Sequence, residues 1–277
     1  MKKKEKPPIP CLPEDFYLID SHCHLDMESY RQDLESILQR AKEHGVHSIV
    51  TIGIDEQSSR AAVALAARYP MLQATVGIHP HDAESAGKNT YSNLQHLILN
   101  NRDHIVAYGE IGLDYAKHYS DESIQRTVFM KQLLLAKDMA LPVIIHDRDA
   151  HEDTISILKQ CGPFPAGGVM HCFSGDMHLA TQVLQLGFYI SIPGVVTFKN
   201  GKTLQDVAAK IPLDSMILET DGPFLSPAPY RGKRNEPAYI PYIAQKVAHL
   251  RGITIQEVAE QTSKNVEKLF DFRVPTP

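Results

Sequence analysis

The chain has 277 residues, 43% of them hydrophobic and 22% charged, which is typical of a soluble globular protein with one large core. Its formal net charge is −5, so global charge gives no support for nucleic-acid binding, and a polyanion site would need a local basic cluster or a metal centre. No apolar run is long enough to cross a bilayer, so we expect no membrane partner.

Residues 1–15 are rich in lysine and proline and lack the apolar stretch of a signal peptide, which predicts a disordered N-terminal tail. The four cysteines form no CxxC pair, which favours reduced thiols and a cytoplasmic protein, or a nuclear one in a eukaryote. Residues 16–273 show no linker or internal repeat and are expected to form one domain. No obligatory protein partner is evident.

Short apolar runs alternate with amphipathic stretches through this domain. The runs are rich in Val, Ile and Tyr, as buried parallel strands are. The expected strands are residues 17–20, 48–53, 73–77, 105–110, 142–146, 167–171, 188–192 and 215–220. The expected helices begin near residue 30 and stop at 44–45, then cover 57–69, 90–101, 121–140, 149–161, 176–186 and 202–210, with two more at the end.

Eight strands, each followed by a helix, predict an α/β fold of a single domain, a (β/α)₈ TIM barrel. A doubly wound sheet is the competing fold. It usually carries a glycine-rich fingerprint after its first strand, whereas this chain has "SHCHLD" there.

Polar side chains follow the expected strands at their carboxyl ends, where barrel enzymes carry their chemistry. Four histidines and two carboxylates gather at this rim: His22, His24, Glu110, His146, His171 and Asp221. Singly, each could be a core histidine, a helix cap or a turn residue. Together they would be desolvated without partners unless a metal binds them. Six imidazole and carboxylate ligands suit two divalent cations bridged by a carboxylate, with Mg²⁺, Mn²⁺, Ni²⁺ and Zn²⁺ all acceptable.

Two cysteines, Cys23 and Cys172, each neighbour one of these histidines. Side chains alternate along a strand, so we expect both thiols to point into the barrel wall, away from the metals.

Seven segments in this order resemble the signature of the TatD-type metal-dependent deoxyribonucleases, a family of amidohydrolase-like TIM barrels. They are "DSHCHLD", "GIHPH", "GEIGLDY", "VIIHDRDA", "HCFSG", "ETDGPFLSP" and "RGKRNEPAYI", and the likeness runs from about Leu18 to Phe270. The resemblance implies a two-metal centre that hydrolyses DNA phosphodiesters, in a family associated with DNA repair. One metal would take His22, His24 and Asp221. The other would take His146 and His171, with Glu110 bridging.

The sequence departs from the family pattern at three positions. Asp147 stands where Ser is common, Gly222 where Ala is common and Phe224 where Tyr is common. All six ligand positions are kept, and only Asp147, beside a ligand, is expected to alter substrate contacts.

The expected reaction is hydrolysis by metal-activated water. As a hypothesis, Asp221 is the general base and acts with Glu110 as a catalytic residue. Asp114 could orient a ligand histidine, although it could equally be a helix cap. His79 ends the third strand on the same rim, and the resemblance favours it as a phosphate contact or leaving-group donor.

Positive charge for a substrate clusters in "YRGKRNEP", where Arg231, Lys233 and Arg234 follow the last strand. Arg148, next to a ligand histidine, could also bind a phosphate. The sequence shows no aromatic ladder for long single strands, which favours attack at a strand end, as a 3′–5′ exonuclease.

Three alternatives compete with a deoxyribonuclease. A D-aminoacyl-tRNA deacylase of the same group would use the same metals for ester hydrolysis. Cyclic-amide and organophosphate hydrolases are disfavoured, because many bridge their metals through a carboxylated lysine where this chain has Glu110. A scaffold protein with a vestigial site is disfavoured because all six ligands are present.

Overall fold

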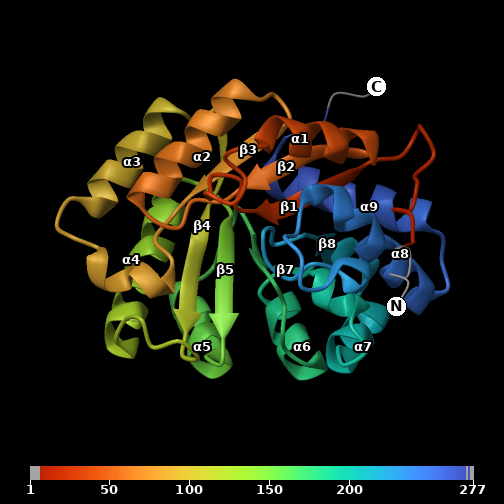
Figure 1. The fold of residues 1–277 in the computed structure, drawn as a ribbon. Helices are drawn as coiled ribbons and strands as arrows, with labels where there is room; N and C mark the ends of the chain where they lie inside the picture. The colour runs from red at the N-terminus through yellow and green to blue at the C-terminus, as the bar shows by residue number, and fades with distance from the viewer. Residues whose placement is uncertain (1–6, 273, 275–277) are drawn as a thin grey trace.

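A computed structural model describes residues 7–272 and residue 274 (Figure 1). Eight strands are hydrogen-bonded in chain order from β1 to β8, and each neighbouring pair is parallel. A parallel bridge between Cys23 and Gly222 brings the end of β1 to the segment that follows β8. The sheet is therefore a nearly closed barrel surrounded by helices, and the predicted TIM-barrel fold is confirmed.

The boundaries follow the hydrophobic pattern closely. The strands are β1 Leu18–Cys23, β2 Val46–Thr51, β3 Leu72–Val76, β4 Ile105–Asp114, β5 Val143–Arg148, β6 Gly168–Met170, β7 Tyr189–Ile192 and β8 Met216–Leu218. The helices are α1 Leu34–Glu43, α2 Glu56–Arg68, α3 Thr90–Asn100, α4 Glu122–Asp138, α5 His151–Cys161, α6 Met177–Gln185, α7 Lys202–Lys210, α8 Ile240–Arg251 and α9 Ile255–Phe270.

Apolar side chains of the strands divide between two clusters. The larger one lies between the strands and the surrounding helices, and α1 contributes Ile37 and Leu38 to it. The smaller one joins residues from strands on opposite sides of the barrel, Ile19 of β1 and Ile144 of β5 among them. It therefore fills the barrel interior, and α9 adds Phe270 to it.

The longest strand, β4, runs four residues past its predicted end. It reaches Asp114, and its register against β5 shifts between Tyr108 and Ile111. Such a bulge re-aims the side chain within it, here Glu110. Beyond the bulge, β4 continues beside β5 because Gly112 has no side chain: a Cβ there would lie 1.9 Å from the carbonyl oxygen of His146.

The first helix begins later than predicted. α1 starts at Leu34, whereas the apolar pattern placed its start near Tyr30. Tyr30 is fully buried, and its hydroxyl donates to the carbonyl oxygen of Asn235 at 2.6 Å. This side chain therefore anchors the loop after β8 and does not belong to the first turn of α1.

The N-terminal tail is described only from Pro7 onward, and residues 1–6 lie outside the described part. Tyr242 donates to the carbonyl oxygen of Pro7 at 2.6 Å, and Leu12 packs against the main core. The C-terminal limit at residue 273 also lies outside the described residues. The domain limits and the disorder of residues 1–15 stay predictions.

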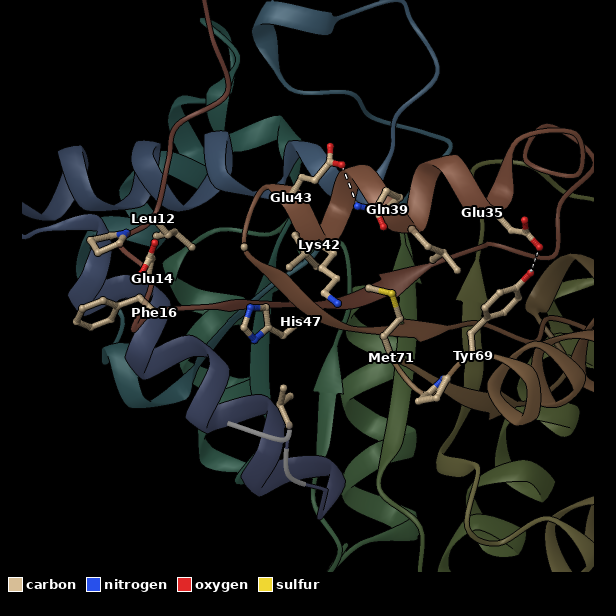
Figure 2. Close-up of a pocket in the computed structure, with 16 residues that line it drawn as sticks. Leu12, Glu14, Phe16, Glu35, Gln39, Lys42, Glu43, His47, Tyr69 and Met71 are labelled. Carbon is tan, nitrogen blue, oxygen red and sulfur yellow. Dashed lines mark hydrogen bonds between the residues drawn. The ribbon is translucent and has the colours of Figure 1, made fainter. Parts of the chain in front are cut away.

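A hollow of about 990 Å³ opens at the amino-terminal ends of β1, β2 and β3 (Figure 2). Leu12 and Phe16 line it on one side, Tyr69 and Met71 on the other, and the Tyr69 hydroxyl donates to Glu35 at 3.2 Å. None of the predicted site residues lines this hollow. The candidate site lies at the opposite, carboxyl-terminal ends of the strands.

Candidate metal centre

The six predicted ligands come together at the carboxyl-terminal end of the barrel. His22 and His24 lie at the end of β1, Glu110 lies in the β4 bulge and His146 lies in β5. His171 follows β6, and Asp221 follows β8. All but His146 are less than 9% exposed, so they face one another inside the barrel mouth.

One group of donor atoms consists of the two histidines at the end of β1 and the carboxylate of Asp221. Asp221 follows β8, which lies next to β1 where the barrel nearly closes. The Nε2 atoms of His22 and His24 are 3.4 Å apart. Asp221 Oδ1 lies 3.8 Å from His22 Nε2 and 3.5 Å from His24 Nε2. Donors about 2.1 Å from a tetrahedral Zn²⁺ lie about 3.4 Å apart, so these separations fit one cation between the three side chains.

A second group surrounds the other side of Glu110. Its Oε1 lies 2.8 Å from His146 Nδ1 and 2.8 Å from His171 Nε2. His79 Nε2 is also 3.3 Å from this oxygen. His146 Nδ1 and His171 Nε2 are 3.4 Å apart. His79 Nε2 therefore lies among the donor atoms of the predicted ligands, and His79, Glu110 and His146 form a further group that could hold a metal ion.

Glu110 stands between the two groups. Its Oε2 lies 3.4 Å from His22 Nε2 and 3.8 Å from His24 Nε2, whereas Oε1 faces the second group. One carboxylate thus offers a different oxygen to each set of donors, which is the arrangement that a bridging ligand requires.

The electrostatics of the cluster favour a cation. Burial alone would raise the pKa of Glu110, but His171 and His79 outweigh it and hold this pKa well below its usual range. Burial would lower the pKa of His171, yet Glu110 and Glu219 raise it well above its ordinary value. The carboxylates therefore attract positive charge into a buried space, which suits divalent cations.

At His22 and His79, burial outweighs the nearby carboxylates. It lowers the pKa of His22 to about 3 and that of His79 to about 4. Both imidazoles are therefore neutral near pH 7, which is the state in which histidine binds a metal.

Further carboxylates hold the ligand histidines in place. Asp114 Oδ2 lies 3.2 Å from His146 Nε2, where a residue that orients this histidine should be. The same oxygen lies 2.8 Å from His81 Nε2. Glu219 Oε1 lies 3.5 Å from His171 Nδ1 and accepts from the Cys172 N–H at 2.6 Å.

The sequence analysis missed His81 and Glu219, although a signal was present for both. His81 stands two residues after His79, the same spacing as His22 and His24. Glu219 stands two residues before Asp221. The repeated two-residue spacing could have marked each pair as one site, although both pairs lie beyond the ends of β3 and β8 and not within the strands.

The two cysteines behave differently. Cys23 is fully buried, with its thiol 3.6 Å from the carbonyl oxygen of Gly222, and it points into the wall as predicted. For Cys172 the strand argument does not hold, because β6 ends at Met170 and Cys172 has a φ of 45°.

The predicted basic cluster does not act as one group. Arg234 donates from both terminal nitrogens to Asp33, at 2.9 and 2.6 Å, and stacks over the Tyr30 ring. Arg231 lies over the Phe198 ring, 4.5 Å from its centroid, and is exposed together with Lys233. Arg148, the last residue of β5, is also exposed on this rim.

The loop of residues 222–236 carries Arg231, Lys233 and Arg234. Hydrogen bonds within the loop and to neighbouring segments hold it in place. Asn235 donates to the carbonyl oxygens of Thr220 and Phe224 at 2.7 and 2.6 Å. Ser226 donates to the carbonyl oxygen of Lys233. Glu236 accepts two bonds from Arg40, at 2.8 and 2.7 Å.

Known proteins are similar to nearly the whole of this chain. Residues 19–271 match the TatD related DNase family. This chain belongs to that family. It is 42% identical to the Bacillus subtilis protein YabD, described as an uncharacterized metal-dependent hydrolase, over 91% of this chain and 98% of YabD.

Two other TatD-family proteins are similar over their whole length. The Erwinia tasmaniensis 3′-5′ ssDNA/RNA exonuclease TatD is 36% identical over 92% of this chain and 100% of its own. The crystal structure of YJJV, a TatD homologue from Escherichia coli, superposes with a TM-score of 0.88 at 34% identity, covering 92% and 98% of the two chains. This TatD-family chain is therefore a metal-dependent hydrolase with an amidohydrolase-like barrel.

Within the described residues of the TatD-family chain, no helix is both long and apolar enough to cross a membrane.

Proposed function

We propose that this chain is a nuclease that removes nucleotides from the 3′ end of a nucleic-acid strand, using two divalent cations. The observation that carries the proposal is the position of Glu110, whose two oxygens face separate groups of donors. Two cations a few ångströms apart are common in enzymes that cleave phosphodiesters.

The chain's own residues have distinct tasks in this proposal. His22, His24 and Asp221 would hold one cation, and Glu110 would contribute to both sites. His146 and His171 complete the second site, with His79 beside them. When bound, the cations activate water and stabilise charge on the phosphoryl oxygens.

Asp221 is the proposed general base. Its side chain is 11% exposed, more than that of Glu110 at 3%, so it can exchange a proton with solvent. His79, whose Nε2 lies 3.3 Å from Glu110 Oε1, is proposed to orient a phosphate or to return a proton to the leaving oxygen.

Exposed cations on the rim are proposed to contact the flanking phosphates. Arg148 and Lys233 are exposed, and Arg231 is exposed beside the Phe198 ring, so all three side chains can reach a nucleic-acid backbone. Arg234 was also predicted to contact the substrate. Its guanidinium forms an ion pair with Asp33, so we propose that its main role is to hold the loop in place.

The Erwinia tasmaniensis relative supports both the polarity and the substrate class, since it is named a 3′-5′ exonuclease of single-stranded DNA and RNA. The strongest competitor is hydrolysis of a D-aminoacyl-tRNA, because ester cleavage would use the same donors.

The test begins with chelator-treated protein to which Mg²⁺, Mn²⁺ or Zn²⁺ is returned separately. Single-stranded DNA labelled at its 5′ or 3′ end is assayed beside a D-aminoacyl-tRNA. We expect stepwise, metal-dependent loss of nucleotides from the 3′ end. The His22→Ala/His24→Ala variant, prepared identically, controls for contaminating nuclease.

Each other result would change the proposal. Shortening from the 5′ end would reverse the polarity. Intact DNA together with deacylated tRNA would replace the nuclease by an ester hydrolase. An Asp221→Asn variant that kept its metals and full activity would remove Asp221 as the base.

A further inference from the structure

Two aromatic side chains stand exposed beside the metal centre. Among the residues that the structure describes, five large hydrophobic side chains are exposed, and Tyr119 and Phe224 are the aromatic ones, at 64% and 49%. Each meets a histidine of the site edge to face. Phe224 lies 6.0 Å from the His24 ring centroid, and Tyr119 lies 4.7 Å from that of His81.

The barrel places these two rings on opposite sides of the centre. Tyr119 belongs to the loop after β4, and Phe224 belongs to the loop after β8. In a sheet that runs in order from β1 to β8 and nearly closes, β4 and β8 face each other across the barrel. The cluster of donor histidines therefore lies between the two aromatic rings.

Both rings are held by fixed backbone. The Phe224 N–H donates to the carbonyl oxygen of Asp221 at 2.9 Å, and its own carbonyl accepts from Asn235. Next to Tyr119, the Ser120 hydroxyl donates to the carbonyl oxygen of His81 at 2.9 Å. These fixed loops hold both exposed rings beside histidines of the site, where a substrate bound at the metal centre would meet them.

We propose that Phe224 and Tyr119 are stacking platforms for unpaired nucleobases on the two sides of the scissile phosphate. Every base has a π-face, so such platforms bind a strand with little regard to sequence. A paired base is stacked within its duplex and unavailable. The platforms would thus select an unpaired strand, a property that the exposed cations alone would not give. This inference deepens the proposed function and takes its substrate class from it.

These platforms could not be recognised from the sequence, because they are two single aromatic residues 105 positions apart and not a ladder. Only the closure of the barrel brings them to one centre.

The test compares natural single-stranded DNA with strands that carry one abasic nucleotide at successive positions from the 3′ end. Binding is measured by fluorescence anisotropy in the inactive His22→Ala/His24→Ala background, and cleavage is measured in the active protein. The variants are Phe224→Leu and Tyr119→Leu. Phe224→Tyr and Tyr119→Phe keep the rings, and Leu134→Ala changes an exposed hydrophobic residue of α4 as a matched control.

We expect each leucine variant to weaken binding of the natural strand about 5- to 100-fold. In the protein with both rings, an abasic nucleotide at the position that stacks on a ring should weaken binding. In each leucine variant, the abasic nucleotide at the position served by the missing ring should cause no further loss of affinity, and this position should differ between the two variants. The ring-keeping variants and Leu134→Ala should match the wild type. Equal binding of natural and abasic strands by the inactive background would overturn the inference.

Failure of the proposed function would look different. If the active protein leaves DNA intact while abasic sites still weaken binding in a Phe224- and Tyr119-dependent way, the nuclease proposal falls and the stacking platforms stand. If DNA is cut but abasic sites and leucine variants have no effect, the nuclease stands and the platforms fall.

Discussion

Glu219 and His171 are linked at the back of the metal centre: Glu219 Oε1 lies 3.5 Å from His171 Nδ1. Glu219 is fully buried and also accepts from the Ser191 hydroxyl at 2.6 Å. Replacing Glu219 by Gln removes the charge that orients the histidine. We expect metal affinity to fall about 10- to 100-fold, as measured by calorimetric titration of the chelated protein.

The control for that change is Glu260→Gln, which alters an exposed carboxylate of α9. It should leave metal affinity unchanged. Wild-type affinity in Glu219→Gln would show that Glu219 acts only on folding.

Gly112 should not tolerate even a methyl group. A Cβ there would lie 1.9 Å from the His146 carbonyl oxygen, and φ is +147°. We expect Gly112→Ala to cost more than about 4 kcal/mol in the free energy of unfolding and to displace the His146 ligand. Gly187→Ala is the matched control, because φ there is +77° but nothing lies within 4 Å, so the cost should be about 1 kcal/mol.

Urea denaturation and metal content distinguish the two glycine variants. If both lost the same stability, the contact with His146 would not be what requires glycine at position 112.

Arg234 should matter more for folding than for substrate. Its guanidinium binds Asp33 at two points and stacks on Tyr30, so Arg234→Gln should lower the free energy of unfolding by about 1 kcal/mol. Lys233→Gln should leave stability unchanged. It should lower the magnitude of the slope of the logarithm of the DNA-binding constant against the logarithm of salt concentration by about the amount expected for one phosphate contact. A salt dependence reduced by Arg234→Gln at unchanged stability would place Arg234 on the substrate instead.

The pair between Asp147 and His151 predicts a pH effect on stability. His151 Nδ1 lies 2.5 Å from Asp147 Oδ2, and this hydrogen bond raises the pKa of His151 above 6.5 despite partial burial. The pair therefore stabilises the fold below about pH 6.5 and loses this effect as pH rises through the folded-state pKa. The His151 side chain is 40% exposed, so the effect should stay below about 1 kcal/mol.

The measurement is urea denaturation of wild type and His151→Gln between pH 5.5 and 8.5. The difference between them should shrink as pH rises. His249→Gln, at an exposed histidine of α8, should show no such trend. A gap that stays constant with pH would mean that Asp147 does not hold a proton on His151.

The sequence was sufficient for the barrel because each buried strand is an apolar run and each helix an amphipathic one. The HxH spacing at His22 and His24 was readable for the same reason, since alternation along β1 is local. The pairing of Arg234 with Asp33 was not readable, because the partner lies 201 residues away. Nor was the extension of β4, which depends on the close approach of Gly112 to His146, a contact with no local signature.

The loop at 222–236 has a consequence for the energetics of binding. Asn235, Ser226 and Glu236 fix this wall of the site through hydrogen bonds within the loop and to α1. A wall whose backbone is ordered before a ligand arrives loses little backbone conformational entropy on binding. The contacts proposed for Phe224 and Arg231 would then be offset only by the ordering of those two side chains, and turnover would not have to wait for this side of the barrel mouth to close.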